Sequence, residues 1–465
     1  MGNLLFLIMY LVLMLLVVFV PQLLRRFHVP AVVAIMLTGI VIGPHAGDLL
    51  GCISHVMDGA YSAQELMTVI RALGLLGLVF LMALAGMEVD LRMLTLEKRP
   101  VIWLSLLTFA IPSLAGYFIY GWFRPDDTIG KWVYASLFAS HSVGIVFPVI
   151  RELGVTKTRF GISVLASTVV TDVLSLVMLA VAIQYKRMQA PAASNAFGGV
   201  SLFERIDVAS LGVWFTPLFL LVIALFILLA AWIIPAVWRK LINSFSPHDD
   251  TQVTFFLLSV LVIVTLGELL GVNLIVGAFI AGLAVVRAEG FEDKGRHLHR
   301  KLEGIGFGVM IPFLFLQIGM ESQPGILFKD WGNVMIALAT VVGLVGSKTF
   351  AGWLALRLSG FSHIKGICAG LMTVPQLSAT LAAAAVALEL EILDQNFFNA
   401  IVLLSMVTTI PVPTMVRYLI DHYHITFDPV AIPDAAAIAS PQLVDSPSAP
   451  RPSLFSRWLN RKKQG

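Results

Sequence analysis

The stretch STVVTDVLSLVML, residues 167–179, places a single aspartate, Asp172, in the middle of an otherwise apolar segment. The apolar block around it runs over residues 161–184, and a helix of about 20 residues is enough to cross a bilayer. A carboxylate at mid-bilayer costs about 2.5–3.5 kcal/mol on insertion scales, and such residues usually face a polar cavity or a partner. This stretch therefore predicts a membrane helix that carries a functional acid.

The rest of the chain repeats this apolar pattern. It has 465 residues, of which 58% are hydrophobic and only 13% charged, about half the charge of a typical soluble domain. Its mean hydropathy is +0.90. The pattern predicts an all-α polytopic membrane protein with about thirteen transmembrane helices. The predicted spans are residues 3–22, 29–44, 69–87, 101–121, 131–150, 161–184, 212–235, 253–270, 273–286, 304–320, 331–356, 365–388 and 397–419.

The basic residues alternate between the loops that join these segments. Seventeen lysines and arginines fall in the odd-numbered loops and seven in the even-numbered ones. Cytoplasmic loops carry the excess of basic residues in membrane proteins. The alternation therefore predicts a membrane protein with its N-terminus outside and its C-terminus in the cytoplasm. The segment 421–465, rich in Ala, Ser and Pro, is expected to form a disordered cytoplasmic tail.

One basic residue lies far from both ends of its predicted span. Lys348 falls in the middle of GSKTFAGWLALRL, residues 346–358, so the membrane is expected to hold one clear lysine and one clear aspartate. A buried Asp172–Lys348 pair could simply lock two helices together. Such a pair adds little stability, because desolvation offsets much of the Coulomb gain. We therefore favour a water-reachable carboxylate that binds and releases a proton or a small cation.

Two predicted spans are interrupted at mid-length. LFASHSVGIVFPVIREL, residues 137–153, and AGLMTVPQLSATLAAA, residues 369–384, each combine Gly and Pro with hydroxyl-bearing side chains. Broken backbone at membrane depth is tolerated only where it is buried in protein or lines a cavity. A proline kink would explain one such segment alone. One interruption in each half of the chain indicates inverted repeats with a binding site near the bilayer midplane.

Several motifs, in order along the chain, resemble one transporter family. The motifs are VPAVVAIMLTGIVIGPH (29–45), LGLLGLVFLMALAGMEVDL (73–91), ASHSVGIVFPVIRELG (139–154), VLASTVVTDVLSLVMLAV (164–181), GVNLIVGAFIAGLAV (271–285), FGVMIPFLFLQIGME (307–321) and GSKTFAGWLALRL (346–358). Over about residues 5–420 the chain is similar to bacterial sodium/proton exchangers of the monovalent cation:proton antiporter superfamily. Within the superfamily it resembles the branch near the glutathione-gated potassium efflux transporters.

The resemblance implies an architecture of thirteen helices with inverted repeats and two crossed, unwound helices. A transmembrane exchanger domain would cover residues 1–420. Its core would lie mainly in 101–184 and 331–419, and its dimerisation domain mainly in 1–45 and 212–286. The core would move against the dimerisation domain like an elevator, and the protein would form a homodimer.

The chain departs from its relatives at the predicted site. Relatives carry Asp-Asp, Asn-Asp or Gln-Asp on the ion-binding helix, whereas this chain has Thr171–Asp172. With one carboxylate, the simplest cycle exchanges one proton for one Na+ or K+ and moves no net charge. Lys348 has lost its usual partner and is expected to turn to Asp172 or to Ser and Thr oxygens. Lys348 would be assigned as a second proton carrier only if the exchange of cations for protons produced a net current.

The two interrupted segments also differ from the family pattern. His141 stands where threonine is usual, which makes it a candidate pH sensor, although a hydrogen-bonded structural histidine is the simpler reading. Where many relatives have Pro-Arg-Gly-Glu, this chain has Pro375-Gln376-Leu377-Ser378, without the charged pair. The polar residues expected at this crossing are Thr373, Gln376 and Ser378.

The predicted function is secondary antiport of H+ against Na+ or K+ across the bacterial inner membrane, serving pH homeostasis. Asp172 would bind the ion, with Thr171, Ser140, Ser142 and main-chain carbonyls as further oxygen ligands. A gated potassium efflux channel and a non-transporting sensor derived from the exchanger fold are the alternatives. We see no nucleophile–base pair, phosphate loop or metal-ligand cluster, so the chain is not expected to be an enzyme or to hold a cofactor. Monovalent cations, protons and the lipid bilayer are the expected partners, and nothing indicates nucleic-acid binding.

Overall fold

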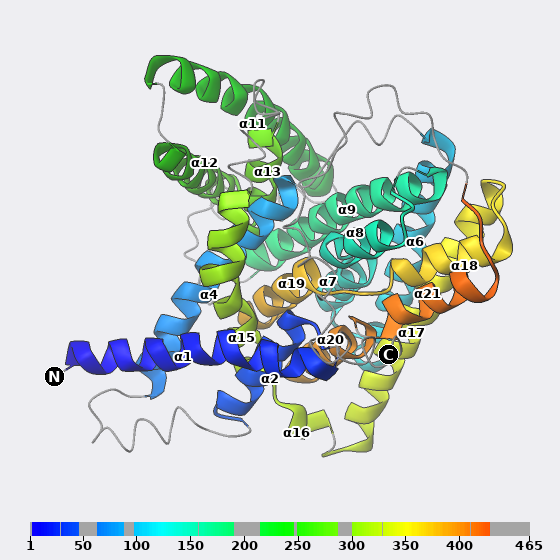
Figure 1. The fold of residues 1–465 in the computed structure, drawn as a ribbon, viewed down its shortest axis with the longest axis horizontal. Helices are drawn as coiled ribbons and strands as arrows, with labels where there is room; N and C mark the ends of the chain where they lie inside the picture. Colours follow the sequence, from blue (N-terminus) through cyan, green and yellow to red (C-terminus); the bar gives the residue numbers. More distant parts are fainter. Residues whose placement is uncertain are drawn as a thin grey trace, which may run out of the picture.

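The computed structural model describes residues 2–27, 29–45, 63–87, 97–156, 158–189, 214–245, 249–286, 300–327, 329–409 and 411–427 (Figure 1). These residues form helices and no β-strand, and each predicted apolar segment holds one helix or a pair of helices. The tail from residue 428 onward lies outside the described residues. In the first half the helices are α1 (Gly2–Leu24), α2 (Ala31–Ile42), α4 (Ala63–Met87), α6 (Lys98–Phe123), α7 (Thr128–Ala139), α8 (Val143–Glu152) and α9 (Arg159–Gln189).

The second half continues the all-helical pattern. A short π-helix, Gly306–Met310, leads into one of its long segments. Within the described residues, eight helical stretches are long and apolar enough to cross a membrane, and four more apolar helices are shorter. The total of thirteen spans stays a prediction. The helices are α11 (Phe215–Phe245), α12 (Asp249–Leu269), α13 (Leu274–Val286), α15 (Ile311–Glu321), α16 (Pro324–Leu327), α17 (Trp331–Leu358), α18 (His363–Met372), α19 (Ser378–Glu389), α20 (Gln395–Thr409) and α21 (Pro411–His422).

The helices pack in two groups (Figure 1). In the first group α4 packs against α13 and α15, α15 packs against α2, and α1, α11 and α12 join at the edge. In the second group α17 packs against α6, α18 and α20, and α9 packs against α6 and α7. Helix α19 touches members of both groups. The helices that carry Asp172 and Lys348, α9 and α17, therefore lie in the second group.

Pairs of glycines allow close helix approaches. Gly39 on α2 and Gly319 on α15 face each other, and a Cβ on Gly39 would stand 2.3 Å from the carbonyl oxygen of Leu316. Gly352 on α17 and Gly370 on α18 do the same in the second group, where a Cβ on Gly352 would lie 2.3 Å from the Gly370 Cα. Small residues at helix crossings are typical of membrane proteins, because backbones can then pack directly. The second contact brings Lys348 next to the interrupted helix α18–α19.

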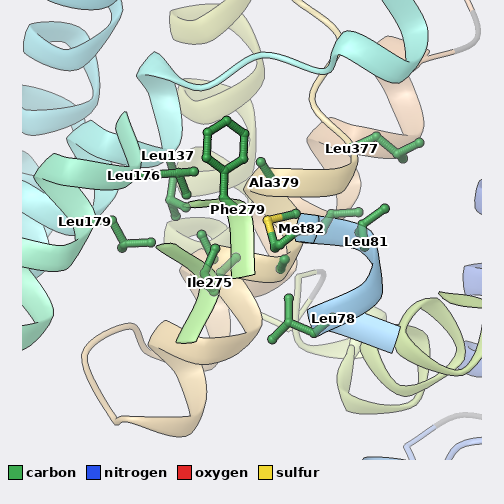
Figure 2. Close-up of a cluster of buried hydrophobic side chains, with 14 of the residues drawn as sticks. Leu78, Leu81, Met82, Leu137, Leu176, Leu179, Ile275, Phe279, Leu377 and Ala379 are labelled. Atoms are coloured by element: carbon green, nitrogen blue, oxygen red, sulfur yellow. The ribbon is translucent and has the colours of Figure 1, made fainter. Parts of the chain in front are cut away.

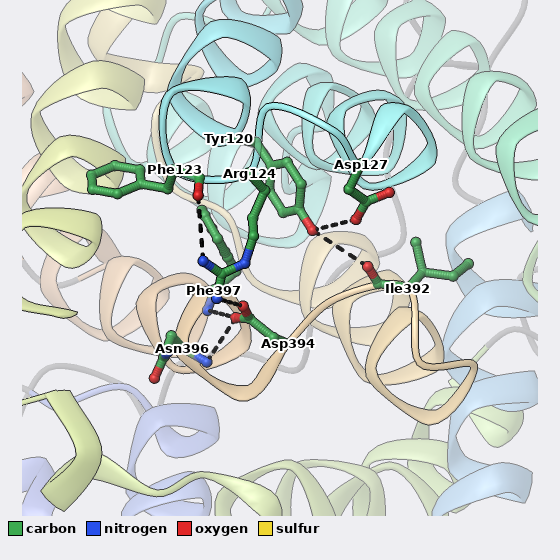
Figure 3. A network of polar contacts seen from close by, with 8 residues as sticks. All are labelled: Tyr120, Phe123, Arg124, Asp127, Ile392, Asp394, Asn396 and Phe397. Carbon is green, nitrogen blue, oxygen red and sulfur yellow. Dashed lines mark hydrogen bonds and ion pairs between the residues drawn. The ribbon is translucent and has the colours of Figure 1, made fainter. Parts of the chain in front are cut away.

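Polar contacts at the helix ends follow the predicted alternation of loops. Arg159 pairs with Glu97 at 2.9 Å, and Arg99 donates to the carbonyl of Leu358, so ends from odd-numbered loops meet. Arg124 pairs with Asp394 at 2.6 Å, and both belong to even-numbered loops (Figure 3). In the same network the Tyr120 hydroxyl donates to Asp127 at 2.7 Å. Within each of these two sets, residues that are far apart in sequence thus lie close together at the helix ends.

The part of the boundary that α4 and α13 form is apolar. Figure 2 shows side chains of α4 and α13 meeting side chains of α7, α9 and the start of α19. Such a surface is held by shape and dispersion contacts rather than by directional hydrogen bonds. The labelled residues, all buried, are Leu78, Leu81, Met82, Leu137, Leu176, Leu179, Ile275, Phe279, Leu377 and Ala379.

Candidate ion-binding site

The first interruption lies between α7 and α8, at Ser140, His141 and Ser142. Helix α7 ends at Ala139, and Ser140 has extended backbone angles, φ −64° and ψ 160°. The carbonyl of Ser142 accepts the first hydrogen bonds of α8, from the N–H groups of Ile145 and Val146. All three residues of the link are buried. Two half-helices joined by a short buried link thus lie where the sequence predicted an interruption.

The second interruption lies between α18 and α19, at residues 373–377. Pro375 sits in this link and disfavours helical angles at the residue before it. Thr373 bonds back to its own helix, because its hydroxyl donates to the carbonyl of Gly370 at 2.7 Å. Ser378 is the first residue of α19. The Ser140 hydroxyl meets the Thr380 hydroxyl at 2.5 Å, so the first interruption contacts the start of α19.

Asp172 reaches the first interruption from α9. The carboxylate is 7% exposed, and its Oδ1 accepts the main-chain N–H of His141 at 2.7 Å. A hydrogen bond from a main-chain N–H favours the charged form of a carboxylate. The structure thus brings Asp172 to the link that holds Ser140 and Ser142, as the sequence predicted.

Lys348 reaches the other side of the same link. Its side chain is fully buried, and its ammonium donates to the carbonyl of Ser140 and, at 2.9 Å, to the carbonyl of Thr373. These carbonyls lie just beyond the C-terminal ends of α7 and α18, where the helix dipole is negative. Of the two contacts that the sequence suggested for Lys348, the structure shows the one to serine and threonine oxygens, made through their main chain.

One peptide group separates the two charges. The Ser140 carbonyl, which accepts from Lys348, and the His141 N–H, which donates to Asp172, belong to the same peptide bond. No described peptide is cis, so the carbonyl and the N–H point in opposite directions. Lys348 and Asp172 therefore face each other across the Ser140–His141 peptide. A cation on the carbonyl polarises the peptide and strengthens the donation of its N–H.

His141 and Thr171 form a pair beside the carboxylate. His141 is buried, and its Nδ1 lies 2.6 Å from the Thr171 hydroxyl. That hydroxyl also lies 2.9 Å from the carbonyls of both Ser167 and Thr168 in its own helix. Thr171 is thus engaged in contacts to protein groups, and its role as an ion ligand stays a prediction. The pH-sensing role of His141 is likewise not tested by this arrangement.

Some buried polar atoms near the link have no protein partner. Among the described residues, Ser142 Oγ, His141 Nε2 and Gln376 Oε1 are buried without a hydrogen bond. Buried polar groups are normally paired, so such atoms point to water or an ion.

Sequence reasoning did not assign a site role to Thr380. Its only signal was a hydroxyl beside a predicted helix break, because its partner Ser140 lies 240 positions away.

Comparison with known proteins is decisive at the level of the family. The model of the transmembrane domain of sodium/hydrogen exchangers matches residues 11–420, which is most of the chain. The chain belongs to the sodium/hydrogen exchanger family. This places it in the monovalent cation:proton antiporter superfamily that the sequence motifs resembled, a family of secondary transporters.

Individual members extend over nearly the same range. The chain is 33% identical over 400 residues to "Probable Na(+)/H(+) antiporter 3" of Methanocaldococcus jannaschii, covering 86% of this chain and 93% of that protein. It is 28% identical to the Na(+)/H(+)-K(+) antiporter GerN of Bacillus cereus, covering 84% and 90%. Among solved structures it matches the sodium proton antiporter MjNhaP1 of M. jannaschii with a TM-score of 0.62 at 14% identity, over 91% and 98% of the two chains. The last match supports the exchanger fold.

Proposed function

We propose that this exchanger is a secondary antiporter that exchanges H+ for Na+ or K+ across a bacterial inner membrane. The observation that carries the proposal is the contact between the buried carboxylate of Asp172 and the unwound link of α7 and α8. A carboxylate in this setting binds either a proton or a cation, and a hard monovalent cation prefers oxygen ligands. The family relatives named as Na(+)/H(+) and Na(+)/H(+)-K(+) antiporters support the same ions.

The ligands of the cation follow from the charge of Asp172 and from the hydroxyl beside it that has no hydrogen-bond partner among the described residues. The Asp172 carboxylate would supply the charge and the Ser142 hydroxyl, buried without a partner, a neutral oxygen. The carbonyl of Ser140 is occupied by Lys348, so we do not include it.

The transport cycle rests on one ion-binding carboxylate. Thr171, beside Asp172, is neutral, so one proton replaces one cation and the exchange is electroneutral. The group of α6, α7, α9 and α17–α20 would be the moving core, and the group of α2, α4, α13 and α15 the scaffold. The apolar contacts in Figure 2 support an elevator-type movement, in which the hydrogen bonds from Asn399 on α20 to the backbone after α15 would have to break. A homodimer with its N-terminus outside completes the proposal.

Binding can be tested without transport. We expect Na+, K+ or Li+ to raise the thermal unfolding midpoint of the purified protein at alkaline pH, and the effect to shrink at acid pH, where protons compete for Asp172. Ser142→Ala should weaken this stabilisation, and Asp172→Asn should remove it. Stabilisation that is the same in wild type and in Asp172→Asn would contradict binding at this carboxylate.

A further inference from the structure

Gln376 joins the second interruption to the end of the first. Its side chain is fully buried in the link between α18 and α19. Its amide nitrogen lies 2.9 Å from the carbonyl oxygen of Leu137, 3.2 Å from that of Phe138 and 3.0 Å from that of Ser140. The last carbonyls of a helix have no partner inside that helix. A single side-chain amide thus caps the C-terminus of α7 from the opposite half of the chain.

The Ser140 carbonyl has two donors. Lys348 and Gln376 both donate to this oxygen, which has two lone pairs to accept with. The N–H on the other side of the same peptide bond donates to Asp172. The donors to the Ser140 carbonyl, Lys348 and Gln376, therefore also fix the direction in which the His141 N–H points at Asp172. Gln376 can contribute a donor beside the ammonium of Lys348 because the amide is neutral, whereas a second cation at that oxygen would repel the first.

We propose that Gln376 is a positioning residue for the ion site. Its amide N–H groups hold the Ser140–His141 peptide in the orientation that directs the His141 N–H to Asp172. This inference rests on the proposed cation exchange, and it assigns to Gln376 a task separate from binding the ion. The cation would bind more weakly without this amide, because Asp172 would lose a fixed donor that stabilises its charged form. The rate of the conformational change would be little affected.

Two substitutions separate a donor role from a merely polar or space-filling one. Gln376→Met keeps the length of the side chain and removes its donors. Gln376→Glu keeps length and polarity but turns an oxygen toward three carbonyls. A donor role predicts that both variants weaken cation binding and that glutamate is no better than methionine. A role in packing or polarity alone predicts that the glutamate or the methionine variant behaves like wild type.

The measurement is cation-driven proton movement in proteoliposomes, with the ion that drives wild type best. We expect each Gln376 variant to raise KM for the cation about 10-fold, with the maximal rate changed less than about 2-fold. The matched control is Gln184→Met, which removes a buried amide from α9, the helix of Asp172. Both polar atoms of Gln184 lack hydrogen bonds, so its KM should stay at the wild-type value.

The possible outcomes distinguish this inference from the function on which it rests. A wild-type KM in Gln376→Met or in Gln376→Glu, while Asp172→Asn is inactive, overturns the positioning role and leaves the exchange standing. Wild-type protein that moves no protons with any of the three cations overturns both. Unfolding midpoints without cation show which variants fold. If methionine prevents folding, the KM of the glutamate variant decides.

Discussion

Asp172 and Lys348 are the two residues whose chemistry the sequence exposed most directly. Asp172 was the clear carboxylate at mid-span, and Lys348 was the one basic residue far from both ends of its predicted span. The structure adds how they are related, because both contact the Ser140–His141 peptide from opposite sides. The sequence could not show this relation. It depends on contact between the two interrupted segments, whose contacting residues lie more than 200 positions apart in sequence.

At the same scale, the His141–Thr171 pair leads to a prediction about pH. We expect His141→Thr to shift the pH profile of exchange, because the substitution removes the one ionisable ring that bonds to the neighbour of Asp172. The measurement is the rate of cation-driven proton movement across roughly pH 6 to 9. Thr171→Val serves as the companion variant, since it breaks the same contact from α9. If the profile of His141→Thr coincides with that of wild type, His141 is a structural residue.

At the scale of helices, the sequence indicated where the spans are and which two of them are interrupted. Pro375 and the run Ser140–Gly144 carried that signal, because proline and hydroxyl side chains disfavour a continuous helix. The ends of the half-helices and the partners of their open carbonyls could not be predicted. These depend on which helices touch, and for α17 and α18 that contact rests on the facing glycines Gly352 and Gly370.

Gly352→Ala tests whether this helix contact supports the site. The new Cβ would fall 2.3 Å from the Gly370 Cα, so α17 must shift away from α18 and carry Lys348 with it. Overpacking of this kind costs about 1–3 kcal/mol. We expect a lower unfolding midpoint together with a loss of exchange. Gly346→Ala on the same helix is the control. A Cβ on Gly346 would meet no atom within 4 Å, so this variant should keep the unfolding midpoint and the exchange activity of wild type. Equal behaviour of the two variants would argue against the contact.

A second helix-scale prediction concerns the end of α15. Asn399 on α20 accepts the N–H of Gln323 at 2.9 Å and donates to the carbonyl of the same residue at 3.0 Å. The side chain thus pairs with the backbone that follows α15. Asn399→Leu leaves both main-chain groups without their partner, at a cost of about 1–3 kcal/mol. We expect a matching loss of thermal stability. Asn396→Leu, one turn earlier on α20, should cost less, because the hydrogen bond of Asn396 is made by its main-chain N–H.

At the scale of the whole molecule, the contacts at the helix ends agree with the loop charges: odd-numbered loops meet odd-numbered loops, and even-numbered loops meet even-numbered ones. Ends from even-numbered loops meet in the Tyr120–Arg124–Asp394 network of Figure 3, and ends from odd-numbered loops meet around Arg159 and Glu97. The positions of lysine and arginine along the sequence predicted this alternation. A division of the helices into two groups was implied only by the family resemblance. The residues themselves did not show it, because apolar residues facing lipid and apolar residues facing protein look alike in a sequence.

The charge balance of the transport cycle is a property of the whole molecule. With a single ion-binding carboxylate, exchange of one proton for one cation moves no net charge. We therefore expect no transient current when a cation gradient is applied to proteoliposomes adsorbed on a capacitive electrode, while a pH dye in the same preparation reports proton movement. A current that scales with proton movement would contradict the single-carboxylate cycle and would assign a second proton to Lys348.

The most direct test of the central claim is proton movement in proteoliposomes with a pH dye, comparing wild type with Asp172→Asn. Asparagine keeps the shape and the acceptor of the His141 N–H but can bind neither a proton nor a cation as a carboxylate does. Na+, K+ and Li+ would be added in turn across roughly pH 6 to 9. The account predicts that at least one ion drives proton movement in wild type and none does in the variant. Equal movement in both proteins, or none in correctly folded wild type, would contradict antiport at Asp172.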